Sequence, residues 1–250
     1  MHPETRTITV NTESGLAVLT VSRIGVGPII TEAGRFCEYQ FKSSDRWQEY
    51  QVLVKCRKLN DQLMPVFGFP RKPLAIRIDS GCLTSEFGDM TCECRQQKEL
   101  GLRQIADWGQ GLLIRIPSQD GRGQGLPFKL ATLTLQEELG MDTVEAAQSL
   151  LRKGQKLDAR TYSGCVGILR FFGIGKGAHL ILLTNNPDKI KALEKNEYVV
   201  TRTPCVIEPT KYTLRHLAAK QQYLHHIGLL APPVTYSQFR KASISRKEDK

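Results

Sequence analysis

The sequence predicts an α/β fold in which a mixed sheet is covered by helices. Three observations support this. From Pro73 onward, short apolar segments alternate with amphipathic ones, which is typical of strands that alternate with helices. Residues 1–72 instead carry apolar stretches separated by polar turns, which indicates a strand-rich N-terminal part. The chain has 250 residues, 40% hydrophobic and 24% charged, and this is enough to bury a substantial core.

The expected elements fall into three regions, residues 1–72, 73–207 and 208–250. In the first region the clearest strands are Leu16–Val21 and Gln51–Val54. In the second, the expected strands are Leu74–Ile78, Leu112–Ile116, His179–Leu183 and Tyr198–Arg202. The helices expected between them are Gln97–Trp108, Pro127–Glu138, Thr143–Arg152, Ser163–Phe172 and Asp188–Glu194. The third region is expected to form a helix, Tyr212–Ile227, and a polar tail that includes Arg240–Lys250.

The composition excludes several classes of protein. Seven scattered cysteines are an odd number in a chain of this length, so metal binding or reactive thiols explain them better than a disulfide framework. A net charge of +10 suits an anionic partner. That partner could be nucleic acid, a membrane surface or a phosphorylated small molecule, but no long basic block interleaved with aromatic residues occurs, so nucleic acid is unlikely. Because we find no apolar run of membrane-spanning length and no signal-peptide pattern, we expect a cytoplasmic protein without a membrane partner.

Three of the cysteines form a cluster. Nine residues separate Cys82 from Cys92, and one separates Cys92 from Cys94. If Cys92 and Cys94 are locally extended, their thiolates lie on the same side of the backbone and the preceding loop brings Cys82 to them. Three thiolates with a fourth position open for water are the pattern of a catalytic zinc ion. The alternatives are a structural zinc ion completed by Cys56 or Cys165, and three buried thiols without metal.

Three further segments carry charged or polar groups, and two of them could bind a phosphate. Gln119–Gly125 holds three glycines together with an aspartate and an arginine, so its backbone amides and guanidinium could hold phosphate oxygens. Asp158 and Arg160 follow a predicted helix, and Thr184–Lys189 joins the end of a strand to a helix. Each segment also has an ordinary explanation, respectively a turn, a surface ion pair and a helix cap.

In their order along the chain, these segments resemble GTP cyclohydrolase II, the zinc enzyme that opens riboflavin biosynthesis. The segments that carry the resemblance are Cys82…Cys92-Glu93-Cys94, Gln119–Gly125, Met141–Ala146, Asp158-Ala159-Arg160 and Leu182–Pro187. The resemblance covers roughly residues 74–207. It implies the mixed α/β fold of that family, GTP or a related purine nucleotide as the substrate, and a homodimer.

The resemblance also implies roles for individual residues. One zinc ion held by Cys82, Cys92 and Cys94 would activate water for attack on C8 of the purine, and formate and pyrophosphate would be released. Asp158 corresponds to the proton acceptor of the family. Arg160 corresponds to a nucleophile toward the α-phosphate, although a protonated guanidinium is better suited to clamping that phosphate. The implied nucleotide-binding residues are Arg77, Gln97, Asp120, Arg122, Thr143, Thr184 and Lys189, and Mg²⁺ is expected on the triphosphate.

The chain departs from the family pattern close to the metal. Asp79-Ser80-Gly81 precedes the first cysteine where His-Ser-Glu is usual, and the cysteine loop is one residue shorter. Asp120 replaces a glutamate and Arg95 a glycine. The active-site tyrosine of the family aligns with Leu133, whose isobutyl group cannot donate or relay a proton.

These departures leave three functional hypotheses. The first is hydrolysis of GTP with release of formate and pyrophosphate, as in riboflavin biosynthesis. The second is a divergent enzyme that stops at the formamidopyrimidine nucleotide or takes another purine in a specialised pathway. The third is a protein that binds nucleotide or nucleic acid without catalysis, a hypothesis that the intact Asp158 and Arg160 disfavour.

Overall fold

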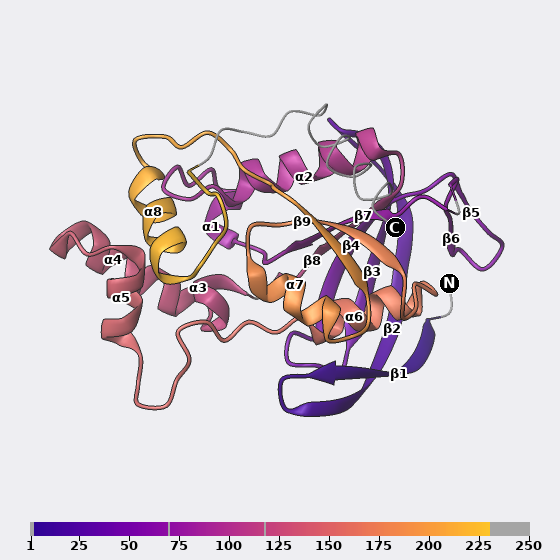
Figure 1. Cartoon of the computed structure of the whole chain (residues 1–250), viewed down its shortest axis with the longest axis horizontal. Helices are drawn as coiled ribbons and strands as arrows, with labels where there is room; N and C mark the ends of the chain where they lie inside the picture. Colours follow the sequence, from indigo (N-terminus) through magenta and orange to yellow (C-terminus); the bar gives the residue numbers. More distant parts are fainter. Residues whose placement is uncertain (1–2, 70, 118, 231–250) are drawn as a thin grey trace, which may run out of the picture.

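A computed structural model describes residues 3–69, 71–117 and 119–230 (Figure 1). Within them, one sheet has eight strands in the order β1-β2-β3-β4-β8-β7-β9-β10. Its strands are β1 (Glu4–Thr12), β2 (Gly15–Thr31), β3 (Gly34–Ser43), β4 (Glu49–Lys55), β7 (Leu74–Asp79), β8 (Gly111–Arg115), β9 (His179–Leu183) and β10 (Val199–Thr203). A separate hairpin consists of β5 (Lys58–Leu59) and β6 (Pro65–Val66). The helices are α1 (Leu83–Glu86), α2 (Cys94–Trp108), α3 (Asp120–Gly123), α4 (Leu126–Leu139), α5 (Thr143–Leu150), α6 (Ser163–Phe171), α7 (Pro187–Glu194) and α8 (Leu214–Tyr223).

The sheet has an antiparallel half and a parallel half. Strands β1 to β4 form an antiparallel meander, and β4 pairs with β8 in antiparallel register, Val52 opposite Ile114. Strands β8, β7, β9 and β10 are all parallel. The N-terminal strands are therefore continuous with the sheet that begins at residue 74. The predicted α/β fold with a mixed sheet covered by helices is confirmed.

The burial pattern explains why the two halves differ in sequence. In β4, buried residues alternate with half-exposed ones, so Tyr50, Val52 and Val54 face a core and their neighbours do not. In the parallel half both faces are covered, and the first four residues of β8 are all buried. Helix α2 packs on β7 and β8, whereas α6 and α7 lie on the other face, where Phe41 meets Phe171 edge to face (Figure 1).

The parallel half contains the point at which the direction of winding reverses. Helix α2 connects β7 to β8 across one face, and α7 connects β9 to its neighbour β10 across the other. Strands β7 and β9 are adjacent, so the chain leaves their carboxyl ends in opposite directions. Ligands of open α/β sheets bind in the crevice at such a position. The segments that begin at Ser80, Ile116 and Thr184 all start at this edge.

Two local expectations are wrong. The C-terminal helix ends at Tyr223 and not at Ile227, because the chain leaves helical geometry at Leu224 and His225 has a positive φ of 54°. Residues 120–123, expected as loop, form the short α3, in which Gly121 and Arg122 are left-handed with φ of 59° and 57°. The predicted tail Arg240–Lys250 lies outside the described residues.

Across the described ranges, no helix combines the length and the apolar character that a membrane span requires.

Candidate active site

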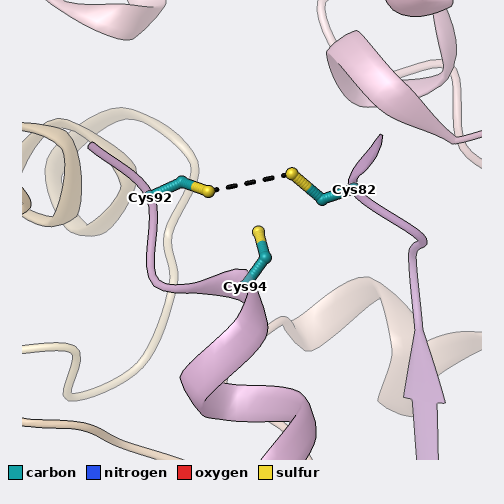
Figure 2. A group of neighbouring side chains, drawn as sticks. All are labelled: Cys82, Cys92 and Cys94. Carbon is teal, nitrogen blue, oxygen red and sulfur yellow. Dashed lines mark hydrogen bonds between the residues drawn. The ribbon is translucent and has the colours of Figure 1, made fainter. Parts of the chain in front are cut away.

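Three cysteine side chains from two chain segments meet beside the carboxyl end of β7. Cys82 follows that strand and precedes α1, whereas Cys92 and Cys94 lie at the start of α2. Their three Sγ atoms lie within 4.8 Å of one another, and the Sγ atoms of Cys82 and Cys92 are 3.7 Å apart. Figure 2 shows the three thiols pointing toward a common centre. None of them is in a disulfide.

The backbone that presents Cys92 and Cys94 is not extended, so the expected local geometry is wrong. Cys94 is the first residue of α2, and Glu93 has φ of −91° and ψ of 1°. The two thiols converge because the chain turns into the helix between them, and not because they share one side of a strand. The spacing therefore predicted which three cysteines come together, although the conformation expected for them was incorrect.

The thiol cluster fits a tetrahedral zinc ion. With zinc–sulfur distances near 2.3 Å, two sulfur ligands of a tetrahedron are roughly 3.8 Å apart. The measured 3.7 Å between Cys82 and Cys92 agrees with this value. Within the described ranges, the group contains no fourth cysteine, histidine or carboxylate. Cys56 and Cys165, the alternative fourth ligands, pack instead in the core that contains α6. The cluster therefore offers three protein ligands and leaves one position of a tetrahedron free.

Lys129, on α4, contacts this cluster and was not anticipated as a site residue. Its ammonium lies 2.8 Å from Cys82 Sγ and 4.0 Å from a carboxylate oxygen of Asp89. Hydrogen bonds from the thiols of Cys92 and Cys94, together with Lys129, lower the pKa of Cys82 below its usual range. A sequence signal existed, because Lys129 lies four residues before Leu133 and therefore on the same face of the helix.

The thiols open onto a first cavity that also holds several of the predicted nucleotide-binding residues. Arg122 donates hydrogen bonds to the carbonyl and the hydroxyl of Thr143, at 3.0 and 2.9 Å. Asp120 accepts one from the backbone amide of Leu83 at 3.0 Å. Leu133 lies in the wall of this cavity. Burial, and then the nearby Arg160, lower the pKa of Arg122 to about 10, so it is charged at neutral pH.

Asp158 and Arg160 form a close ion pair. Arg160 Nε donates to both carboxylate oxygens of Asp158, at 2.9 and 3.1 Å, and its Nη2 also contacts one of them. Burial alone would raise the pKa of Asp158, but the hydrogen bonds and charge of Arg160 bring it below its ordinary value. Arg160 lines the metal cavity, whereas Asp158 lies behind it and lines a separate outer hollow.

The remaining predicted nucleotide-binding residues line a second cavity, which shares Cys82, Cys94 and Arg160 with the first. They are Arg77, Gln97, Thr184 and Lys189. Arg77 is buried, with Nη1 3.2 Å from the carbonyl of Leu183, and its Nε has no hydrogen-bond partner. Lys189 donates to the carbonyl of Ile78 at 2.8 Å. Burial, followed by repulsion from Arg77 and Arg160, lowers the pKa of Lys189 to about 7. This concentration of cations favours a polyanion.

The structure thus brings eleven of the twelve predicted site residues to two cavities that share a wall, and places Asp158 behind Arg160. The sequence reasoning missed a set of ionisable residues on the same walls. They are Glu93, Lys129, His216, Lys220 and His226. Three of them come from residues 208–230, for which no sequence signal was available, because only the tertiary fold brings that segment to the site.

The structure also explains the unusual residues before Cys82. Gly81 has a positive φ of 39°, and a Cβ atom there would lie 2.4 Å from the carbonyl oxygen of Ile116. A glutamate therefore cannot replace Gly81 without moving the backbone. Asp79 is buried and lies 3.8 Å from a guanidinium nitrogen of Arg77 and 4.0 Å from one of Arg115. It therefore offsets part of the positive charge at the end of β7.

Replacing Gly81 tests this close backbone approach. We expect Gly81→Ala to lower the free energy of unfolding by about 3 kcal/mol. This value adds the cost of holding a non-glycine residue in a left-handed conformation to the cost of packing a methyl group into occupied space. Gly140→Ala is the matched control, since Gly140 has φ of 63° and nothing within 4 Å of its Cβ position. It should cost about 1 kcal/mol. Urea unfolding measures both changes, and equal costs would contradict the steric explanation.

Comparisons with known proteins agree with this geometry. Residues 23–204 match the GTP cyclohydrolase II family. The chain is 37% identical over 187 residues to GTP cyclohydrolase-2 of Picrophilus torridus, an alignment that covers 73% of this chain and 93% of that protein. It is 34% identical over 208 residues to GTP cyclohydrolase-2 of Streptomyces coelicolor, covering 82% and 86%.

Another relative is considerably longer. The riboflavin biosynthesis protein RibBA of Aquifex aeolicus is 41% identical over 158 residues, which are 62% of this chain. The matched part spans 37% of that protein's length. The family match covers far more than half of the 250 residues and includes all three clustered cysteines and both cavities' predicted ligands. This chain therefore belongs to the GTP cyclohydrolase II family.

Proposed function

We propose that this protein opens the imidazole ring of GTP by hydrolysis at C8, with release of pyrophosphate. The observation that carries the proposal is the junction of the two cavities. Three thiols with room for one more ligand line the first cavity, and two of them, those of Cys82 and Cys94, also line the second. That second cavity holds Arg77, Arg160 and Lys189. A purine nucleotide has the two matching parts, a ring to be hydrolysed and a polyanionic chain.

The metal is proposed to be zinc, held by Cys82, Cys92 and Cys94. A zinc ion with three protein ligands supplies an activated water for hydrolysis. The thiol geometry fits that ion, as described above, and soft thiolate ligands select it over magnesium or calcium. Magnesium is proposed to accompany the triphosphate, where its charge would add to that of the arginines.

The guanidinium of Arg160 is proposed to clamp the α-phosphate. Burial opposes its charge, but Tyr162 and then the contacts with Asp158 raise the pKa of Arg160 above its ordinary value. It therefore stays protonated and has no lone pair for nucleophilic attack. Asp158 orients this guanidinium because both of its carboxylate oxygens accept hydrogen bonds from Arg160, which fixes the plane of the guanidinium group. For Asp158 to accept a proton, the role that the family resemblance implies, this ion pair would have to open when the substrate binds.

The nucleotide-binding residues are proposed to divide between base and phosphates. Arg77, Lys189 and Thr184 lie in the strongly cationic second cavity and would bind the triphosphate. Arg122 and Thr143 lie in the first cavity with Leu133 and would lie beside the base or ribose. Because Lys189 has a pKa of about 7, binding of the polyanion should favour its protonated form.

The first test is metal-dependent ring opening. Purified protein loaded with zinc and given GTP and magnesium should lose guanine absorbance and release pyrophosphate. Cys92→Ser should abolish this activity and lower the zinc content, because one of three ligands is lost. Cys165→Ser is the control, since that thiol is buried in the core and lines neither cavity. Ring opening by protein free of metal would contradict the proposal. Absence of a product from every purine nucleotide would favour a binding protein without catalysis.

Leu133 favours a second candidate outcome, in which the ring is opened but formate is not released efficiently. This side chain lies in the wall of the metal cavity at the position of the family tyrosine, where no proton can be transferred. We therefore propose that release of formate is impaired and that the formamidopyrimidine nucleotide accumulates. Three relatives of this chain are named for riboflavin biosynthesis, and a formylated product would separate this protein from that pathway.

Leu133→Tyr tests this outcome. We expect the wild-type protein to give less than one formate per ring opened, and the variant to give a higher ratio because the phenol restores a proton donor. Mass analysis of the products, with formate measured in parallel, gives the ratio. Leu133→Phe is the matched control, since it has the ring without the hydroxyl. Stoichiometric formate from the wild-type protein would contradict the proposed role of Leu133.

A homodimer, implied by the family resemblance, remains part of the proposal.

A further inference from the structure

The C-terminal helix α8 lies outside the matched residues 23–204, yet it forms part of both cavities. His216, Lys220 and Leu224 line the metal cavity, and Lys220 also lines the second cavity together with His226. Lys220 is therefore in the wall that the two cavities share. The helix packs against α5, beside which it lies in Figure 1.

Specific contacts hold this segment in place. Lys220 Nζ lies 2.8 Å from Glu93 Oε1, and His216 Nε2 lies 3.6 Å from Glu93 Oε2. Beyond the helix, the backbone amide of Ile227 donates to the carbonyl of Asn185 at 2.8 Å. Arg202 Nη2 donates to the carbonyl of Ile227 at 3.0 Å. The helix is thus attached to the cysteine segment, and the chain that follows it is attached to the loop after β9.

The partner of Lys220 is Glu93, which lies within the cysteine segment. Glu93 separates Cys92 from Cys94 and is the residue at which the chain turns into α2. Its side chain is 4% exposed and that of Lys220 is 16% exposed, so the pair is largely removed from water. A buried carboxylate without a partner is strongly unfavourable. Loss of Lys220 would therefore drive Glu93 toward solvent and rotate the backbone that presents both thiols.

We propose that Lys220 is a positioning residue of the metal centre, and that through it α8 is an integral wall of the active site. Its ammonium fixes Glu93, and Glu93 fixes the turn that presents Cys92 and Cys94. The inference rests on the proposed function only in assuming that the three cysteines hold a divalent metal ion. It concerns a residue of the segment outside the family match.

Charge and position predict opposite effects on metal affinity. Lys220 is a cation close to the thiol cluster, so its charge alone opposes binding of a divalent ion. If Lys220 acted only through that charge, its removal would raise the affinity for metal. If it positions the ligands, its removal lowers the affinity, because partners that orient metal ligands are typically worth 10-fold to 100-fold in metal binding. The sign of the change separates the two roles.

The experiment uses cobalt(II) as the metal probe and the full chain, without substrate. Thiolate-to-cobalt charge-transfer absorption is titrated for the wild-type protein and for variants. We expect Lys220→Met to lower cobalt affinity by about 10-fold or more. Lys220→Arg should restore it, because a guanidinium can also hold Glu93. Lys211→Met is the matched control: it removes the same charge from an exposed residue whose ammonium lies 4.9 Å from the centre of the Tyr212 ring and which lines neither cavity as described.

A double variant protects the test against misfolding. Lys220→Met combined with Glu93→Gln removes both charges and leaves no buried ion unpaired. Positioning predicts that it also binds cobalt more weakly than the wild-type protein and shows an altered absorption spectrum. Unchanged affinity and spectrum in the double variant, or a higher affinity in Lys220→Met, would overturn the inference while leaving the proposed function intact. Failure of the wild-type protein to bind cobalt would instead overturn the metal centre itself.

Discussion

The approach of three thiols to within 4.8 Å constrains the rest of this site. Such a cluster can hold a metal only if the strand that precedes Cys82 and the helix that begins at Cys94 meet at one edge of the sheet. The parallel order of β8, β7 and β9 meets this requirement, because it brings the carboxyl ends of these strands together. The chain also reverses its winding here, which leaves a crevice beside the metal position.

The charges around the cluster follow from the same constraint. Lys129 contacts Cys82, and Arg160 lies in the wall between the two cavities. Lys220 lies in the same wall, and ion pairs with Asp158 and Glu93 hold Arg160 and Lys220, respectively. A site built in this way favours a substrate with several negative charges near a hydrolysable ring. Leu133 is the exception, an apolar residue in the wall of the first cavity at the position where the family resemblance implies a tyrosine.

Much of the fold could be predicted because buried apolar positions recur along the sequence with the period of a strand or a helix. The apolar run His179–Leu183 is a strand with those limits, and it ends at Thr184, where a site residue was expected. Cys82, Cys92 and Cys94 were found from their spacing, although Cys94 proved to be helical. Lys220 could not be found, because its contact with Glu93 joins residues that are far apart in sequence. The requirement for a glycine at position 81 could not be predicted from the sequence either, since it depends on how closely the backbone at Ile116 approaches.

The central claim is a metal centre with three protein ligands and one position open to water. X-ray absorption at the zinc edge of the loaded protein tests it most directly. We predict three sulfur ligands near 2.3 Å and one lighter ligand, oxygen, at about 2.0 Å. Four sulfur ligands would contradict the claim, because they would indicate a closed structural site.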